Sequence, residues 1–292
     1  MSRLFFSSLS GVDYGGSINP LSLNPTVYFQ TFDTSYLTPS SPSFGTPITE
    51  IRQYTAETYT AIPPDCAPTW GTLNSSDLLY FYTGSGGCWP PPCTGECNSI
   101  FYEVNQNINF MSTSGYSFTL YFVAKPLSGV TNPFTDVHYI FDDAPENRGT
   151  PRTVNVERLV MYNNKDVYLR TETSDYNFIL DLPIEVNSDV TELESKNLRV
   201  FSVRAKDTGD LVNTVAYSYV NGIQTTAITQ SVVTTSTTTG LDYFSIGGIS
   251  EIGPYDEQYT GYFGELIIFN EFHSLSTHNS IVNFLKERWG IT

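Results

Sequence analysis

The chain has 292 residues, a formal net charge of −16 and only 15% charged residues, alongside 20 Tyr and 19 Phe. So acidic a chain is repelled by nucleic acid and by anionic membrane surfaces, and no apolar run reaches transmembrane length, which excludes nucleic-acid binding and membrane insertion. The length allows one large or two modest domains, and the abundance of aromatic residues favours an all-β fold.

Residues 1–97 are rich in Pro, Ser, Thr, Gly and aromatic residues, and contain Arg3 and Arg52 but no Lys. Short strands are predicted at 26–32, 50–60 and 78–83, with Pro-rich breaks between them. We expect an extended arm that is ordered by contact with another molecule, because ordering such a segment alone is costly. The apolar run near the start is too short for a signal-peptide core, so no classical export signal is expected.

Four cysteines fall within one short window of this arm: Cys66, Cys88, Cys93 and Cys97. Their spacing is not that of a zinc ribbon. Three interpretations remain open: one or two local disulfides in an extracellular setting, free buried thiols, or a metal site.

Residues 98–292 show regular strand signals. Strands are predicted at 116–125, 158–162, 166–170, 176–182, 198–205, 215–220, 242–248 and 261–270. Asn221-Gly222 separates two apolar runs, and both residues tolerate positive φ, which predicts a tight hairpin. Many short strands with frequent turns indicate a sandwich or jelly roll.

The strand predicted at 261–270 is apolar on both faces, which places it between two layers. Strict alternation puts Phe263 on one face with Ile267 and Phe269, and Leu266 on the other face with Ile268.

A helix is expected after this strand. Ser276 is the expected N-cap, because its hydroxyl can accept from the free N–H groups of the first turn. Ile281, Leu285 and Trp289 recur at helical spacing and predict a buried stripe, and Gly290 suits the left-handed position that ends a helix.

These motifs resemble concanavalin A-like domains of the laminin-G/pentraxin type. The end of the chain carries the family's glycine, strand glutamate and Trp-Gly stop at Gly261, Glu265 and Trp289-Gly290. The segments 117–120, 219–222 and 244–248 match its "Ser-Phe-Thr-hydrophobic", "Tyr-Val-Asn-Gly" and "Ile-Gly-Gly" motifs in order. The resemblance covers about residues 98–292 and implies a concanavalin A-like β-sandwich, or jelly roll, with one short C-terminal helix, preceded by the 1–97 arm.

Relatives of this fold include glycoside hydrolases, which need two suitably spaced carboxylates. Their usual Glu-x-Asp-x-x-Glu run is absent: Glu192 and Glu194 have strand-like spacing without a third acid, and Glu251 and Glu257 flank a proline in a loop. Glu265, the family's strand glutamate, is expected to make a structural hydrogen bond. The chain is therefore not expected to be an enzyme.

Three histidines, His138, His273 and His278, lie outside any nucleophile motif. We expect surface or helix-cap histidines, with a metal pair at His273 and His278 as the alternative.

Laminin-G-type domains often bind calcium at the rim of the sandwich, and calcium is the one cofactor considered. Hard oxygen ligands cluster at Asp142, Asp143, Glu146 and Asn147, which suits calcium. The alternative is a solvated acidic turn.

A second acidic loop carries Tyr255, Asp256, Glu257 and Tyr259. Aromatic rings beside planar polar groups are the side chains that recognise sugars, so these four residues are the candidate glycan site.

The sequence favours a non-enzymatic virion structural protein: a capsid decoration, fibre or baseplate module with a lectin-like domain. Its expected location is the virus particle, after synthesis in the host cytoplasm. Its expected partners are other virion proteins, copies of itself and host-surface glycans. A free carbohydrate-binding or adhesion module and a glycan-active hydrolase are the alternatives, because a fold does not fix a function.

Overall fold

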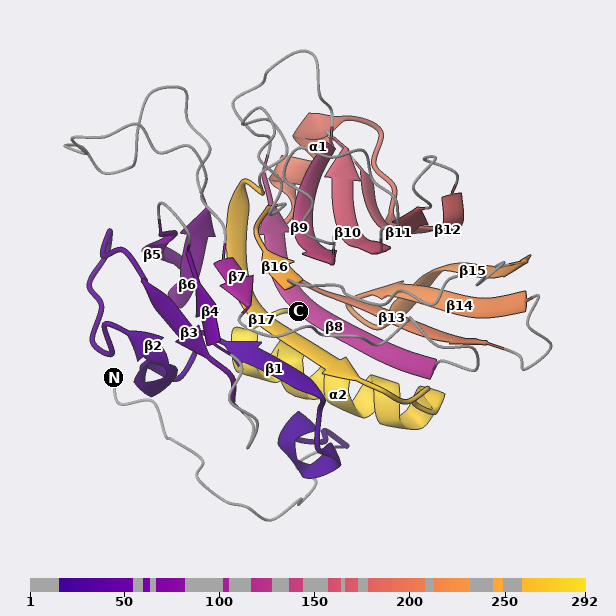
Figure 1. Cartoon of the computed structure of the whole chain (residues 1–292), viewed down its shortest axis with the longest axis horizontal. Helices are drawn as coiled ribbons and strands as arrows, with labels where there is room; N and C mark the ends of the chain where they lie inside the picture. Colours follow the sequence, from indigo (N-terminus) through magenta and orange to yellow (C-terminus); the bar gives the residue numbers. More distant parts are fainter. Residues whose placement is uncertain are drawn as a thin grey trace.

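Figure 1 shows the computed structural model of the chain. It describes residues 16–54, 60–63, 67–81, 102–104, 117–127, 137–143, 157–163, 166–172, 178–207, 213–231, 244–248 and 259–292. Within these residues the fold is built almost entirely of antiparallel β-strands, with a long helix near the C-terminus.

The first of two sheets carries the helix. Its described strands run in the order β15-β14-β13-β8-β17-β6-β5, and β1 pairs with β17 on the edge that β6 also uses. The bounds of its strands are β1 Val27–Gln30, β5 Thr69–Leu73, β6 Ser76–Phe81, β8 Ser117–Pro126, β13 Arg199–Asp207, β14 Asn213–Val220, β15 Ile223–Ser231 and β17 Gly261–Phe269.

The second sheet runs in the order β12-β11-β10-β9-β16-β7-β4-β3-β2 among the described strands. Its bounds are β2 Leu37–Thr38, β3 Glu50–Arg52, β4 Thr60–Ile62, β7 Tyr102–Val104, β9 Val137–Asp143, β10 Glu157–Asn163, β11 Asp166–Glu172, β12 Phe178–Glu185 and β16 Phe244–Ile246. Three short helical segments complete the described part: η1 Pro20–Leu23, η2 Thr34–Tyr36 and α1 Val190–Ser195.

The inner faces of the two sheets share one apolar core. Phe81 on β6 packs edge to face against Tyr102 on β7, with ring centroids 6.1 Å apart. Phe122 on β8 stacks on Phe201 of the neighbouring strand β13 at 4.8 Å. Because side chains from both sheets fill the same buried cluster, the fold is the predicted all-β sandwich.

The predicted hairpins are confirmed. Asn221 and Gly222 join β14 to β15 with φ of 52° and 85°, the left-handed backbone that such a two-residue turn requires. Strands β10 and β11, which were predicted at 158–162 and 166–170, pair antiparallel with Asn163 opposite Asp166. The strand predicted at 116–125 is β8, which is buried on both faces along most of its length.

Strand β17 is buried on both faces as expected, but a bulge changes which residues share a face. Its pairing with β8 shifts register between Phe263 and Glu265, so Gly264 is the extra residue. Phe263 therefore lies in the core between the sheets with Leu266, and not beside Ile267 as strict alternation predicts.

The helix α2 (Leu275–Trp289) lies along the outer face of the first sheet (Figure 1). The predicted stripe of Ile281, Leu285 and Trp289 is buried there, in a second apolar cluster. Gly290 ends the helix in the left-handed conformation, with φ of 64° and ψ of 34°, as predicted. The helix thus covers the outer face of the sheet around Ile267 and Phe269, which explains why β17 is apolar on both sides.

The start of α2 differs from the expectation by two residues. The Ser274 hydroxyl accepts a hydrogen bond from the Thr277 backbone N–H at 3.1 Å, so Ser274 is the N-cap. Ser276 lies inside the helix and is exposed.

Replacing Ser274 by Ala should lower the free energy of unfolding by about 1 kcal/mol, because one N–H of the first turn loses its acceptor. The matched variant Ser276→Ala should change it by less than about 0.5 kcal/mol, as exposed sites do. Urea unfolding of both variants measures the difference, and a larger loss for Ser276→Ala would contradict this capping geometry.

The N-terminal residues depart most from the prediction of a separate arm. Val27, Tyr28 and Phe29 on β1 are fully buried, and β1 pairs with β17. Strands β5 and β6 belong to the first sheet, and β2, β3 and β4 belong to the second. The described part of residues 1–97 is therefore ordered by the sheets of its own chain, and the expected boundary at residue 97 marks no separate unit in it.

The candidate strand at 192–194 is also wrong. Glu192 and Glu194 lie in the helix α1, whose first turn is capped by Asp189. Ser188 donates its backbone N–H and its hydroxyl to the Glu192 carboxylate, both at 2.7 Å. Such reciprocal capping favours a helix over a strand at this position. None of the described helices is long and apolar enough to cross a membrane.

Candidate functional site

A hollow in the described residues lies on the outer face of the first sheet. It encloses about 370 Å³ and is lined by Phe44, Gly45, Thr69, Trp70, Gly71, Tyr80 and Tyr262. This set is called the outer pocket below. Its volume lies at the lower end of the range of roughly 300–1,000 Å³ that is typical of ligand pockets.

Two tyrosines on adjacent strands form one wall of the outer pocket. Tyr80 on β6 and Tyr262 on β17 are cross-strand partners, so their side chains share a face. Their ring centroids are 4.8 Å apart and the ring planes are tilted by 31°. Both side chains are partly exposed. Burial raises the pKa of Tyr262, so its phenol stays protonated and neutral at physiological pH.

Gly71 on β5 forms the floor between these rings. A Cβ atom at this position would lie 3.1 Å from Tyr80 Cβ and 3.5 Å from Tyr262 Cε1. The absence of a side chain at Gly71 is therefore what leaves the ring wall accessible.

A segment at the sheet edge closes the outer pocket. Gly45 donates its N–H to the Trp70 carbonyl at 2.8 Å, and the Trp70 N–H donates to Thr46 at 2.8 Å. These bonds hold the neighbouring Phe44 at the rim, where 71% of the residue is exposed. An exposed Phe that backbone bonds hold beside two tyrosines is a fixed contact surface for a ligand.

The lining groups determine what the outer pocket can do chemically. Its described side chains are aromatic rings, the hydroxyls of Thr69, Tyr80 and Tyr262, and no charged group. The aromatic rings can pack against an apolar face of a ligand, and the hydroxyls can both donate and accept hydrogen bonds. This arrangement can bind a flat, hydroxylated molecule, and it contains no pair of carboxylates for acid–base catalysis.

Of the four sequence-predicted glycan residues, the structure describes only Tyr259. Tyr255, Asp256 and Glu257 fall outside the described residues. Tyr259 is fully buried: its hydroxyl donates to the Tyr262 carbonyl at 2.8 Å, and its ring packs on Phe81. The Tyr259 ring is therefore not accessible to a sugar, because it is packed inside the sandwich.

The predicted calcium ligands are only partly described. Asp142 and Asp143 lie in strand β9, where Asp142 pairs with Ser245 and Asp143 with Glu157, and not in a turn. Their side chains, and all of Glu146 and Asn147, fall outside the described residues. Across the described ranges, no three His, Cys, Asp or Glu side chains gather as a metal site would require. The calcium site stays a prediction.

The cysteine window is also untested. Cys66, Cys88, Cys93 and Cys97 all fall outside the described residues, so the three interpretations of this window stay open.

Two of the three histidines are buried and not at the surface as expected. His273 is 3% exposed, and His278, in the first part of α2, is fully buried. His278 Nε2 shares a hydrogen bond with Ser202 Oγ at 2.8 Å, and its Nδ1 lies 3.0 Å from Asn279 Oδ1. Ser202 is itself fully buried, so this serine–histidine pair has no access to a substrate. The side chain of His138 is outside the described residues.

Burial, with a smaller contribution from Arg204, lowers the pKa of His278 to about 4. An unfolded histidine titrates near 6.5, so between these values the unfolded chain binds more protons and stability falls as the pH falls. Between pH 7 and pH 5 the wild type should lose about 2 kcal/mol more unfolding free energy than His278→Gln. Urea unfolding at the two pH values measures this, and equal losses for both proteins would contradict it.

Glu265 makes the structural hydrogen bonds that were predicted for it. Glu265 is fully buried on β17 and its carboxylate accepts three hydrogen bonds: from the Tyr28 hydroxyl, from Arg288 Nη1 at 2.7 Å and from Trp289 Nε1 at 2.6 Å. Because these donors come from β1 and α2, the carboxylate joins both ends of the chain to the first sheet.

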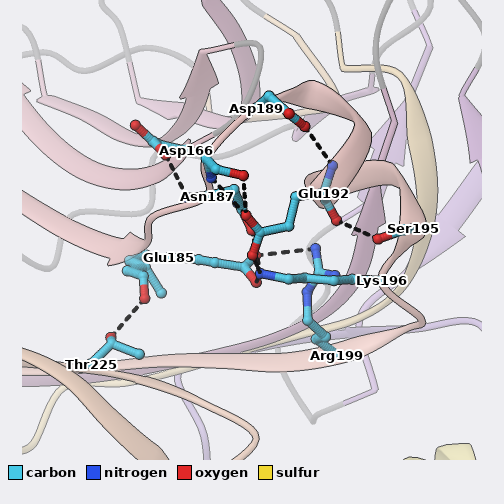
Figure 2. A network of polar contacts seen from close by, with 11 residues as sticks. Asp166, Glu185, Asn187, Asp189, Glu192, Ser195, Lys196, Arg199 and Thr225 are labelled. Carbon is cyan, nitrogen blue, oxygen red and sulfur yellow. Dashed lines mark hydrogen bonds and ion pairs between the residues drawn. The ribbon is translucent and has the colours of Figure 1, made fainter.

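A second charged network holds the corner where β12 leads through α1 to β13 (Figure 2). Glu185 is nearly buried, with Lys196 Nζ 3.0 Å from Oε1 and Arg199 Nη2 3.1 Å from Oε2. Lys196 also donates to Asn187 and lies 3.3 Å from Glu192 Oε1. Two cations thus neutralise the two carboxylates, which is the arrangement of a structural ion-pair network.

This corner also joins the two sheets. Thr225 on β15 donates its hydroxyl to the Ile184 carbonyl on β12 at 2.6 Å (Figure 2). Ser218 on β14 donates likewise to Pro183 at 2.7 Å. The network therefore stabilises the sandwich.

No protein-family model and no curated relative matches the sequence. Solved structures resemble the fold. The binding domain of botulinum neurotoxin serotype D has a TM-score of 0.53 at 14% identity, over 93% of this chain and 56% of that chain. The binding domain of Paraclostridial Mosquitocidal Protein 1 has a TM-score of 0.52 at 12% identity, over 86% of this chain and 53% of that chain.

A further structure of the serotype D ligand-binding domain, in complex with N-acetylneuraminic acid, has a TM-score of 0.51 at 11% identity. It matches 93% of this chain and 56% of that chain. The chain thus spans just over half the length of the toxin domains that it resembles. At these identities the likeness shows a shared fold.

The residues of the outer pocket were not identified from the sequence. Phe44, Gly71 and Tyr262 are far apart along the chain, and none lies in a recognisable motif. One pattern in the sequence points to the two pocket tyrosines. In each of two predicted strands a tyrosine stands between two core residues, as in Leu79-Tyr80-Phe81. That signal becomes useful only when the pairing of β6 with β17 is known.

Proposed function

We propose that this chain is a non-enzymatic glycan-binding module, and that the outer pocket is its binding site. The observation that carries the proposal is the ring wall of Tyr80 and Tyr262 over the bare floor at Gly71, with Phe44 at the rim. Sugars bind proteins through an apolar ring face and through hydroxyls, and both kinds of partner line this pocket.

The comparisons support the proposal at the level of the fold. The similar structures are binding domains of toxins, and one of them was determined with N-acetylneuraminic acid bound. A rigid sandwich that carries a binding site at its edge suits recognition, because the scaffold holds the contact groups in place.

The choice of a binding module over a hydrolase rests on the lining of the outer pocket. Glycoside hydrolysis needs two carboxylates on either side of the scissile bond. The described lining supplies none, and the carboxylates of Glu185 and Glu265 are engaged by cations elsewhere. In its simplest form the proposal describes a free carbohydrate-binding or adhesion module, which acts without any partner other than the glycan.

A glycan array tests the proposed function. The wild type is expected to bind a subset of the immobilised glycans, and Phe44→Ala is expected to lose most of that signal. Ile223→Ala is the matched control, because Ile223 is an equally exposed apolar residue, at 74%, on the β14–β15 hairpin. Absence of binding by the wild type, or equal losses in both variants, would overturn the proposal.

The concanavalin A-like, jelly-roll assignment is part of the same proposal. Two antiparallel sheets with a shared core and a helix on one outer face support it. An experimental structure that traces every connection between the sheets would test the jelly-roll order.

A place in a virus particle, among other virion proteins or copies of this chain, is the extension inferred from the sequence. Its main argument was an arm that needs a neighbouring subunit for order. The described part of that segment is held within the sandwich instead. The proposed place in a virus particle therefore now rests on the amino-acid composition of residues 1–97. Light scattering of the purified protein tests it: an assembly would support the extension, and a monomer at high concentration would count against it.

A further inference from the structure

We propose that the outer pocket selects neutral pyranose sugars over acidic ones. This inference rests on the proposed function, and it names the class of glycan that the site would take.

The polar groups of the outer pocket are neutral. The hydroxyls of Thr69, Tyr80 and Tyr262 match the hydroxyls of a sugar, since each can donate and accept one hydrogen bond or more. A carboxylate ligand instead needs a cation or several converging N–H groups, because desolvating an unpaired charge is costly. The described lining has no Arg, Lys or His.

Lys125 on β8 is the cross-strand partner of Tyr262 but is not part of the described pocket lining. Burial and the charge of Arg199 lower the pKa of Lys125 from its ordinary value, while Glu194 acts in the opposite direction.

The net charge of the chain acts in the same direction. With a formal charge of −16, the protein repels an approaching anion at long range. This repulsion does not act on a neutral glycan. A neutral glycan also binds without removing the strongly held hydration shell of a charged group.

The shape of the outer pocket limits the ligand further. Tyr80 and Tyr262 present tilted rings above Gly71, and Phe44 closes the rim. This is a short aromatic wall and not a long groove, which fits a single ring or the terminal unit of a chain. The pyranose ring with its C–H groups on one face is the expected contact.

Saturation-transfer NMR distinguishes the two classes of sugar. The probes are the methyl pyranosides of glucose, galactose and mannose, with N-acetylneuraminic acid as the acidic probe. At least one neutral probe should show transfer from the wild type, at an affinity at least about tenfold higher than that of the acidic probe. The transfer should disappear in Gly71→Val and remain unchanged in Lys125→Met.

The outcomes separate the two proposals. Transfer to N-acetylneuraminic acid alone, lost in Gly71→Val, would overturn the neutral selectivity and leave the glycan site in place. A loss of binding in Lys125→Met would show that a cation takes part and would also overturn it. No transfer to any of these probes, together with a silent glycan array, would overturn both proposals.

Discussion

Replacing Glu265 by Ala is expected to lower the free energy of unfolding by about 3–5 kcal/mol. The substitution removes the charge partner of the Arg288 guanidinium and the acceptor of the Trp289 N–H, and removing one partner of a buried ion pair has a cost of this size. The Tyr28 hydroxyl loses its acceptor as well. Since these groups connect β1 and α2 to the first sheet, we expect both elements to loosen together.

Urea unfolding measures this loss, and an exposed ion pair provides the control. Glu50 lies 3.3 Å from Arg52, with the Arg52 side chain exposed and that of Glu50 partly exposed, so Glu50→Ala should cost less than about 1 kcal/mol. Hydrogen exchange should show faster opening of amides in both β1 and α2 for Glu265→Ala. If Glu265→Ala were no less stable than Glu50→Ala, the carboxylate would not hold the two ends of the chain.

Filling the floor of the outer pocket should abolish glycan binding with little loss of stability. Gly71→Val adds a Cβ that meets Tyr80 at 3.1 Å and further methyl groups that occupy the space before the rings. A loss of at least tenfold in affinity, about 1.4 kcal/mol, is expected. Valine itself is well accepted in a strand, which limits the cost to the fold.

Thr72→Val is the matched control for this variant. Thr72 is the next residue on β5 and is exposed, and its side chain points to the opposite face of the strand. Isothermal titration with the best glycan from the array should give the same affinity for Thr72→Val as for the wild type. Comparable losses in both variants would point to a general effect on β5 and not to the pocket.

Much of the fold follows from local patterns in the sequence. The turn at Asn221-Gly222 and the stop at Gly290 are positions where positive φ favours those residues, and the structure has them there. The two apolar faces of β17 correctly predict a strand between two layers. The bulge at Gly264 could not be predicted, because it depends on how β17 pairs with β8 and not on β17 itself.

The N-terminal residues show why composition alone misleads. Their Pro-rich breaks were interpreted as the joints of an arm, whereas in the described residues they separate short strands that join two different sheets. Tyr28 illustrates the point: its buried hydroxyl meets Glu265 and Arg288, residues more than 230 positions away. Such pairing is set by tertiary contacts and leaves no periodic signal.

The residues of the outer pocket were not predicted, for the same reason. The sequence drew attention to loops with adjacent acidic and aromatic residues, such as Tyr255 to Tyr259. The outer pocket instead brings together single residues from separate strands, and Gly71 contributes by the absence of a side chain. Only the register between β5, β6 and β17 places these residues side by side.

The most direct test of the central claim is an amide chemical-shift titration of the ¹⁵N-labelled protein with the best-binding glycan. The account predicts saturable shifts centred on Gly45, Gly71, Tyr80 and Tyr262, and none around Ile223 at the distant hairpin. Saturable shifts confined to another part of the surface, with these four amides unmoved, would contradict it.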